Sequence, residues 1–295
     1  MEHKTLAKLI TQIENNPEVA PQILQQFPEH QSKVIGFTGS PGVGKSSLID
    51  RVIRYIRTRD LSVAVVAIDP SSPFTRGAFL GDRIRMREHF VDDNVFIRSM
   101  ASRGALGGLC DAIFDVVKLL EVSGFDYVLV ETVGIGQSEI EISHLVDVTV
   151  LVLSPGFGDE VQMLKAGVME IADLYVVNKS DLPESDTVYS QLLAFLALAG
   201  KSEQQLCKAS THANNGVREV VEKIERLWES FYADGTIERR RKRRTRYHAE
   251  HIVRKIVEQA MNTVQENATN PYEFVKLALS RLCENHLRGG QGGGI

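Results

Sequence analysis

One eight-residue segment of the sequence has the composition of a phosphate-binding loop. It reads Gly39-Ser40-Pro41-Gly42-Val43-Gly44-Lys45-Ser46 and satisfies the pattern G-x-x-x-x-G-K-[ST] in full. Its glycines allow backbone conformations that other residues avoid, so successive N–H groups can point at one anion. Lys45 is placed to bridge the β- and γ-phosphates, the Ser46 hydroxyl to ligate Mg²⁺, and Ser47 to meet the α-phosphate. The segment therefore predicts a nucleoside-triphosphate site.

Three carboxylates are candidates for the metal and the γ-phosphate. Asp69 follows the apolar run Val63–Ile68, Asp82 lies in FLGDRIRM, and Glu131 ends the run FDYVLVE. The order Glu131-Thr132-Val133-Gly134 has the layout of the D-x-x-G segment of GTPases, with Glu in place of Asp, so the Gly134 amide is placed to sense the γ-phosphate. We expect Asp69, Asp82 and Glu131 to hold Mg²⁺ directly or through water; the alternative is that such an acid caps a helix.

The identity of the residue after Gly134 bears on the intrinsic rate of GTP hydrolysis. It is Ile135, whereas small signalling GTPases carry there a Gln that orients water. Slow intrinsic hydrolysis is therefore expected unless a partner completes the site.

A second motif predicts which base is bound. Asn178-Lys179-Ser180-Asp181 follows the apolar run LYVV. The Asp181 carboxylate can accept hydrogen bonds from N1–H and the amine of guanine, whereas adenine offers an acceptor at N1. Lys179 is expected to pack on the base face and Asn178 to tie neighbouring loops together. Ser210-Thr211 stands where GTPases often carry Ser-Ala, whose backbone contacts the guanine oxygen.

The elements that must position these motifs alternate in type. Short apolar runs predict strands over Val34–Phe37, Val63–Ile68, Val95–Ser99, Tyr127–Glu131, Val148–Leu153 and Leu174–Asn178. Helical stretches separate most of them, which indicates an α/β fold, a P-loop NTPase with a mostly parallel sheet flanked by helices. The expected regions are a helical N-terminal extension (1–31), a GTPase domain (32–232), a helical C-terminal region (233–288) and a disordered glycine-rich tail (289–295). In the third region, long helices are predicted over Ile237–Val264 and from Asn270-Pro271 to about His286.

Composition narrows the class further. Hydrophobic residues make up 43% and charged residues 24% of the chain, as in ordinary globular proteins, and no apolar run is long enough to span a membrane. Three widely spaced cysteines and the absence of a leader pattern favour a cytoplasmic location.

Residues 239–246 (RRRKRRTR) carry seven basic side chains. Such a run suits nucleic acid or anionic lipid, or else a solvated helix face or a contact with an acidic partner.

Several longer segments resemble one family of G proteins. They are GSPGVGKSSL, AIDPSSPFTRGAFLGDRIRM, RSMASRGALGGL, VETVGIGQSE, LSPGFGDEVQMLKAG and VVNKSD. In these the chain is similar to the MeaB/ArgK/MMAA group, the G-protein chaperones of adenosylcobalamin-dependent methylmalonyl-CoA mutase. The resemblance implies a Mg²⁺-dependent GTPase, a B12-dependent acyl-CoA mutase as partner, and a C-terminal dimerisation arm that makes a homodimer.

The resemblance also implies roles for single residues. It places Asp82 and Arg85 in a first switch, Glu131–Glu139 in a second, and Gly156–Lys165 in a third loop that couples the nucleotide to the mutase. Asp159 and Lys165 are the charged members of that loop. The candidate catalytic residues are therefore Lys45, Asp82, Arg85, Glu131 and Lys165.

Other functions are expected to require different sequence features. A nickel-insertion GTPase for hydrogenase or urease would want a Cys/His cluster or a His-rich tract, but the eight His are dispersed. A kinase linked to amino-acid transport is disfavoured by the guanine-reading motif. A nucleic-acid-binding module would rest on residues 239–246 alone.

Overall fold

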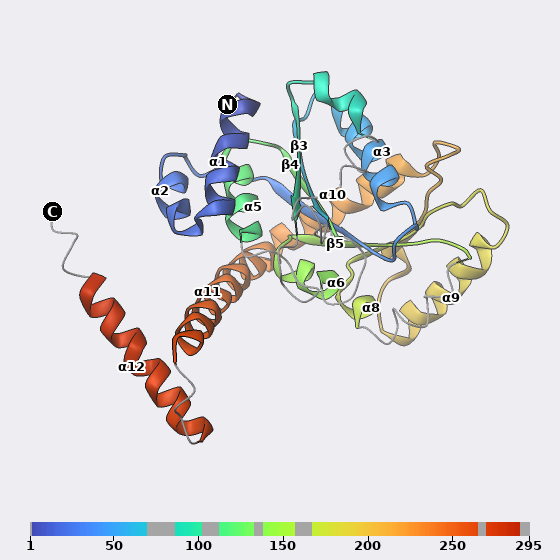
Figure 1. Ribbon diagram of the computed structural model, residues 1–295. Coiled ribbons are helices and arrows are strands. Elements are labelled where there is room, and N and C mark those ends of the chain that lie inside the picture. Colours follow the sequence, from blue (N-terminus) through green and yellow to red (C-terminus); the bar gives the residue numbers. More distant parts are fainter. Residues whose placement is uncertain are drawn as a thin grey trace. The chain divides into compact units, whose positions relative to one another are not determined.

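The protein is described by a computed structural model that covers residues 2–69, 86–101, 112–132, 138–156, 167–264 and 270–289. Its strands are β1 (Lys33–Thr38), β2 (Val63–Asp69), β3 (Val95–Ala101), β4 (Tyr127–Glu131), β5 (Val148–Leu153), β6 (Leu174–Val177) and β7 (Leu206–Lys208). All pairs are parallel, in the order β3-β2-β4-β1-β5-β6-β7. Figure 1 shows helices on both sides of this sheet. The predicted α/β class with a parallel sheet is confirmed, and six of these strands lie where the apolar runs placed them.

Helices connect the strands and extend the chain at both ends. The α-helices are α1 (His3–Asn15), α2 (Ala20–Leu24), α3 (Lys45–Arg57), α5 (Ile113–Val122), α6 (Ser138–Glu141), α8 (Val168–Ile171), α9 (Ser185–Leu198), α10 (Val217–Ala233), α11 (Thr236–Thr263) and α12 (Pro271–Gly289). Short 3₁₀ turns are η1 (Pro17–Val19), η2 (Arg87–Val91), η3 (Ile142–His144) and η4 (Glu203–Gln205). No helix in the described ranges is both long and apolar enough to cross a bilayer.

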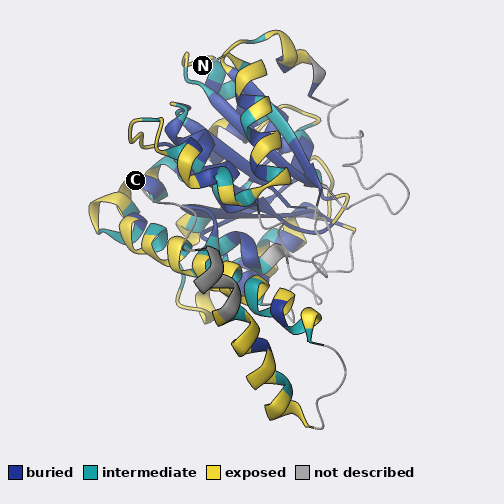
Figure 2. Ribbon diagram, turned by 60° about the vertical axis from the view of Figure 1, so that its left-hand side comes forward, coloured by how far each residue is buried: buried dark blue, intermediate teal, exposed yellow. Residues whose placement is uncertain are grey.

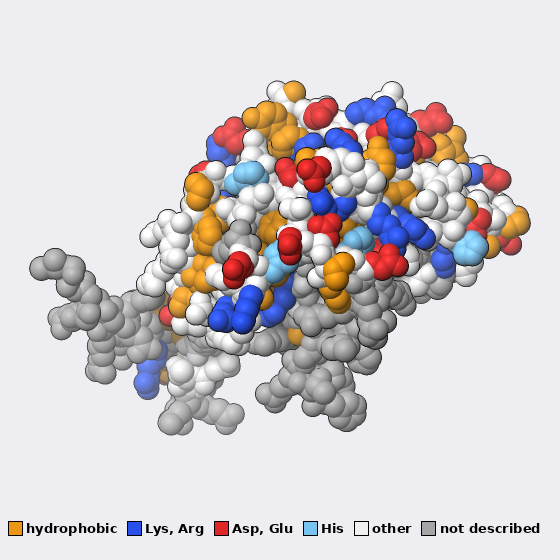
Figure 3. Space-filling view, turned by 90° about the horizontal axis from the view of Figure 1, so that it is seen from above, with side chains coloured by type: hydrophobic (Ala, Val, Ile, Leu, Met, Phe, Trp, Pro, Cys, Tyr) orange, Lys and Arg blue, Asp and Glu red, His pale blue; other side chains and the backbone are white. Residues whose placement is uncertain are grey.

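The core lies on both faces of the sheet, because side chains alternate along each strand. On one face, Val150 and Val176 pack with the apolar sides of α3 and α10. On the other face, Leu151 and Tyr175 pack with α8 and α9. Figure 2 shows the sheet buried between helices whose outer sides are exposed. On the surface seen in Figure 3, acidic and basic side chains are interspersed.

The chain divides into two compact units, residues 1–244 and 245–295. The first unit holds the sheet, the N-terminal helices and the first turns of α11. The second holds the rest of α11 and α12. The boundaries expected at residues 31 and 232 both fall inside the first unit and remain predictions about functional regions. The tail beyond Gly289 lies outside the described residues.

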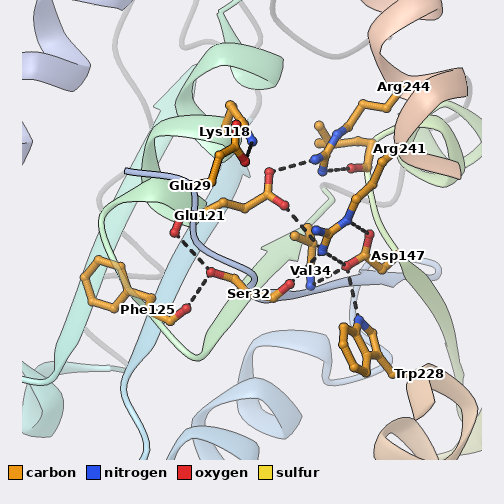
Figure 4. Close-up of polar contacts among 11 residues, drawn as sticks. Glu29, Ser32, Val34, Lys118, Glu121, Phe125, Asp147, Trp228, Arg241 and Arg244 are labelled. Atoms are coloured by element: carbon orange, nitrogen blue, oxygen red, sulfur yellow. Dashed lines mark hydrogen bonds and ion pairs between the residues drawn. The ribbon is translucent and has the colours of Figure 1, made fainter. Parts of the chain in front are cut away.

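The basic run at the start of α11 is partly internal to the first unit. Arg241 donates to Asp147 from Nε (3.1 Å) and Nη2 (2.7 Å), and Arg244 donates to Glu121 over 2.7 Å (Figure 4). Arg240 meets Asp173 with both terminal nitrogens, over 2.6 and 2.8 Å. Asp147 and Glu121 are each only 1% exposed. We call these three arginines and their three acids the ion-pair cluster.

Two acids of the ion-pair cluster also fix the amino ends of two strands, β1 and β5. Asp147 accepts from the backbone N–H of Val34 and from the indole of Trp228 (Figure 4), and Asp173 accepts from the N–H of Thr149. Within the basic run, Lys242 and Arg243 are exposed instead. Three of the seven basic side chains in the run therefore stabilise the fold from within, a role that the charge pattern alone did not indicate.

Candidate nucleotide-binding site

The phosphate-binding loop connects β1 to α3, as its motif requires. Gly39 has φ 139° and Gly44 has φ 92°, both in the region that favours glycine. A Cβ atom on Gly39 would lie 2.2 Å from the carbonyl oxygen of Val152, and one on Gly44 would lie 2.4 Å from the Asn178 amide nitrogen. Neither position can accept a side chain without moving the neighbouring strand or motif.

The two chemically active side chains of the loop are buried. Lys45 is 6% exposed, and its ammonium donates to the carbonyls of Gly39 (2.5 Å) and Ser40 (3.1 Å). This holds the cation against the inside of the loop. The Ser46 hydroxyl donates to Oε1 of Glu131 over 2.6 Å, although 85 residues separate the two. Of the remaining loop residues, Val43 is buried, Ser47 is half-buried and Pro41 is exposed.

The carboxyl ends of β2 and β4 bring the candidate metal ligands to one edge of the sheet. Glu131 ends β4 and is 5% exposed. The register pairs Ala67 with Glu131, so the backbone of Asp69 lies two residues further along the neighbouring strand. Ser46 and Glu131 thus offer hydroxyl and carboxylate oxygens, the hard donors that Mg²⁺ prefers, and this donor set fits the ion. Asp82, Arg85, Gly134 and Lys165 lie outside the described residues.

The base-reading motif is joined to the phosphate loop by its own side chains. Asn178 is fully buried, and its amide donates to the carbonyl of Val43 over 2.9 Å. Lys179 has φ 55°, and its ammonium donates to the carbonyl of Gly42 over 2.8 Å. Bonds within the protein itself therefore hold the end of β6 to the phosphate loop.

Asp181 is exposed but oriented. The buried Ser210 hydroxyl donates to its carboxylate over 2.5 Å, and the Ala213 amide donates to the same hydroxyl over 3.0 Å. The bond from Ser210 lowers the pKa of the Asp181 carboxyl, so Asp181 is ionised at neutral pH and ready to accept two donors. Sequence reasoning gave Ser210 and Thr211 only a backbone role. The side-chain role of Ser210 was missed, because it depends on a contact 29 residues apart in the chain.

Comparison with known proteins agrees with this geometry. A family model described as "Methylmalonyl Co-A mutase-associated GTPase MeaB" matches residues 6–267. The chain belongs to the MeaB family. A putative GTPase of Pyrococcus abyssi is 39% identical to this MeaB-family chain, over 97% of the chain and 95% of the relative.

Two further relatives carry more specific names. The GTPase ArgK of Escherichia coli is 39% identical over 61% of this chain and 56% of its own length. The methylmalonic aciduria type A homolog of Caenorhabditis elegans, a mitochondrial protein, is 38% identical over 70% of this chain and 54% of its own length. The predicted MeaB/ArgK/MMAA membership is confirmed. The protein is a GTPase that binds GTP and GDP.

Solved structures confirm the fold. A structure titled as a LAO/AO transport system kinase aligns with 97% of this chain and 94% of its own, with a TM-score of 0.65 at 24% identity. HypB of Helicobacter pylori, solved with nickel, aligns with 72% of this chain and 97% of its own, with a TM-score of 0.51 at 17% identity. At these identities, the likeness concerns the fold alone.

Proposed function

We propose that this GTPase serves as a chaperone of an adenosylcobalamin-dependent acyl-CoA mutase, with methylmalonyl-CoA mutase as the first candidate. GTP hydrolysis would gate the loading of the cofactor into the mutase or protect the loaded enzyme. The observation that carries the proposal is the MeaB family match, which spans residues 6–267 and is named for that mutase. A cytoplasmic location is part of the proposal, supported by the three widely spaced cysteines.

The side chains around the phosphate loop support the following division of roles. Lys45 neutralises charge on the β- and γ-phosphates, from a position where it already faces the loop carbonyls. The Asp181 carboxylate selects guanine, with Ser210 fixing its orientation. Gly134 contributes its amide to the γ-phosphate, and Arg85 contributes a cation to the first switch.

Mg²⁺ would be held by Ser46, Glu131, Asp69 and Asp82. The hydrogen bond from Ser46 to Glu131 supports this proposal, because it brings a hydroxyl and a carboxylate to one place at the sheet edge. When bound, Mg²⁺ supplies charge neutralisation between the β- and γ-phosphates. Alanine in place of Asp69 or Glu131 should raise the Mg²⁺ concentration needed for half-maximal hydrolysis. An unchanged Mg²⁺ dependence in both variants would show that the metal lies elsewhere.

Coupling to the mutase is proposed to run through residues 156–165. Intrinsic turnover should be slow because Ile135 replaces the water-orienting Gln, and the mutase should accelerate it by ordering this loop with Lys165. A cation delivered to the phosphoryl transition state is worth roughly 10³- to 10⁵-fold in other GTPases.

The test measures GTP turnover with and without the cognate mutase in the parent, Lys165→Ala and Asp159→Ala. Both variants should keep near-parental basal rates and lose most of the stimulation. Equal falls in basal rate would make the loop structural, and intact stimulation would mean that the coupling runs by another route. If no adenosylcobalamin-dependent mutase binds or stimulates the parent in either nucleotide state, the chaperone role is wrong.

A homodimer through the C-terminal region is part of the proposal. On α12, Tyr272, Val275 and Leu279 follow one another at spacings of three and four residues and are 86%, 46% and 51% exposed. A second copy of the chain is the proposed cover for this stripe, since most soluble oligomers are symmetric pairs. Light scattering at micromolar concentration should give a dimer for the parent and a monomer for Val275→Lys combined with Leu279→Lys. A monomeric parent would contradict the proposal.

A further inference from the structure

Residues 86–92 are fastened along one side of α3. His89 and Asp50 share a hydrogen bond of 3.0 Å between Nε2 and Oδ1. Arg54 pairs with Glu88 over 2.5 Å, and Arg57 pairs with Asp92 over 2.8 Å. Because residues 50, 54 and 57 are spaced by four and three, they lie on one face of α3. The segment around η2 is thus held to the helix by three consecutive bridges.

The bridges differ in burial. Glu88 keeps 70% of its side chain exposed and Asp92 keeps 31%, whereas His89 keeps 8% and Asp50 keeps 12%. Met86, at the start of the segment, is 1% exposed and belongs to the core beside α3. Exposed ion pairs contribute little, while a buried hydrogen bond to a charged group contributes more. Of the three bridges, the His89–Asp50 bond therefore contributes most to holding residues 86–92 against α3.

The partners of this bond are close in the chain to residues of the nucleotide site. Asp50 lies one helical turn after Ser46, on the helix that begins with Lys45. His89 lies four residues after Arg85 and seven after Asp82. The bond therefore joins the helix of the phosphate loop to the segment that directly follows those two residues in the chain.

We propose that His89 is a positioning residue for GTP hydrolysis: its bond to Asp50 holds residues 86–92, which directly follow Asp82 and Arg85 in the chain, against α3. The inference rests on the roles proposed for Asp82 and Arg85. Burial alone would raise the pKa of Asp50, but the bond from His89 and the charge of Arg54 outweigh it, so the pKa lies below its usual value. Asp50 is thus an ionised acceptor for the imidazole N–H.

The expected size of the effect follows from the placement of catalytic groups. Misplacement of a catalytic group by about 1 Å costs up to roughly 100-fold. We expect kcat to fall at least about fivefold, with GTP KM and GDP affinity within about twofold of the parent, because Asn178, Asp181 and the loop amides are not moved.

Three substitutions separate positioning from general packing. His89→Phe keeps the ring volume and removes the bond. His89→Gln can still donate from a nitrogen placed like Nε2, whereas His89→Asn has the same chemistry on a side chain too short to reach. We expect low kcat in His89→Phe and His89→Asn and near-parental kcat in His89→Gln. Arg59→Gln is the matched control, since Arg59 lies two residues after the end of α3 but pairs with Glu225 of α10 over 2.6 Å.

The measurements are single-turnover GTP hydrolysis, GDP binding by calorimetry, and amide hydrogen exchange of residues 70–92. His89→Asn should exchange faster in this segment than His89→Gln. Parental kcat in both His89→Phe and His89→Asn would overturn the inference, as would an equal fall in kcat and GDP affinity. If Asp82→Ala and Arg85→Ala lower kcat while the His89 variants do not, only this inference fails. If those two variants keep parental kcat, their proposed roles fail and this inference fails with them.

Discussion

Removal of Arg241 should destabilise the first unit more than the loss of any exposed arginine in the same run. Its guanidinium makes two bonds to Asp147, one to the Ser32 carbonyl, and an ion pair to Glu121 over 3.5 Å. Arg241→Ala leaves two carboxylates, each 1% exposed, without this compensation. Breaking one side of a buried pair costs about 3–5 kcal/mol, a large part of the roughly 5–15 kcal/mol that stabilises a domain.

The assay for this prediction can use the single tryptophan of the chain. Trp228 donates to Asp147 over 3.2 Å, so its fluorescence reports on the ion-pair cluster itself. Urea unfolding should give a lower midpoint for Arg241→Ala, an intermediate one for Arg241→Lys, and a change within about 0.5 kcal/mol for the exposed Arg243→Ala. Adding Asp147→Asn to Arg241→Ala should cost less than the sum of the two single changes. Equal stabilities of Arg241→Ala and Arg243→Ala would refute the reasoning.

Three further predictions concern the site and a buried acid. Asp181→Asn should shift preference from GTP towards xanthosine triphosphate, which offers a carbonyl where guanine has its amine; equal turnover of GTP and ATP by the parent would contradict the assignment. Lys45→Ala should lower single-turnover hydrolysis by at least about 100-fold while far-UV circular dichroism stays parental, because it deletes the cation that faces the phosphates; a loss under tenfold would argue against that role. Burial raises the pKa of Asp115 to about 6, so the folded state holds a proton there that the unfolded chain loses near pH 4. The free energy of unfolding therefore falls as the pH rises from about 4 to 6. Urea unfolding across that range should show Asp115→Asn more stable than the parent by up to about 3 kcal/mol at pH 7 and by nothing at pH 3.5.

Local patterns predicted most of the sheet and the ends of its strands. Runs such as Val148–Leu153 are apolar on both faces, which only a covered parallel strand explains, and their bounds agree with the structure. β7 was missed as a strand, because Leu206–Lys208 is three residues long and pairs on one side only. The phosphate loop and the guanine motif were found because their geometry depends on backbone and side chains that are adjacent in sequence.

Pairings between distant residues could not be predicted in the same way. The sequence holds 38 acids and 34 basic residues, so nothing in it selects Asp147 as the partner of Arg241 or Asp50 as the partner of His89. The topology of the fold determines those pairings, because it places β5 beside the start of α11 and η2 beside α3. The basic run 239–246 shows the consequence: its charges are visible in the sequence, but which of them face inward depends on the fold.

The ion-pair cluster also bears on the order in which the molecule is made. Its acids belong to residues 121, 147 and 173, and its arginines to residues 240–244. A ribosome that adds roughly 5–20 residues per second needs about 4 to 14 seconds to pass from Asp173 to Arg244. During that interval the last two strands, β6 and β7, are synthesised, while three carboxylates destined for the interior still lack the arginines of α11. Final closure of the amino edge of the sheet must therefore wait for the first turns of α11.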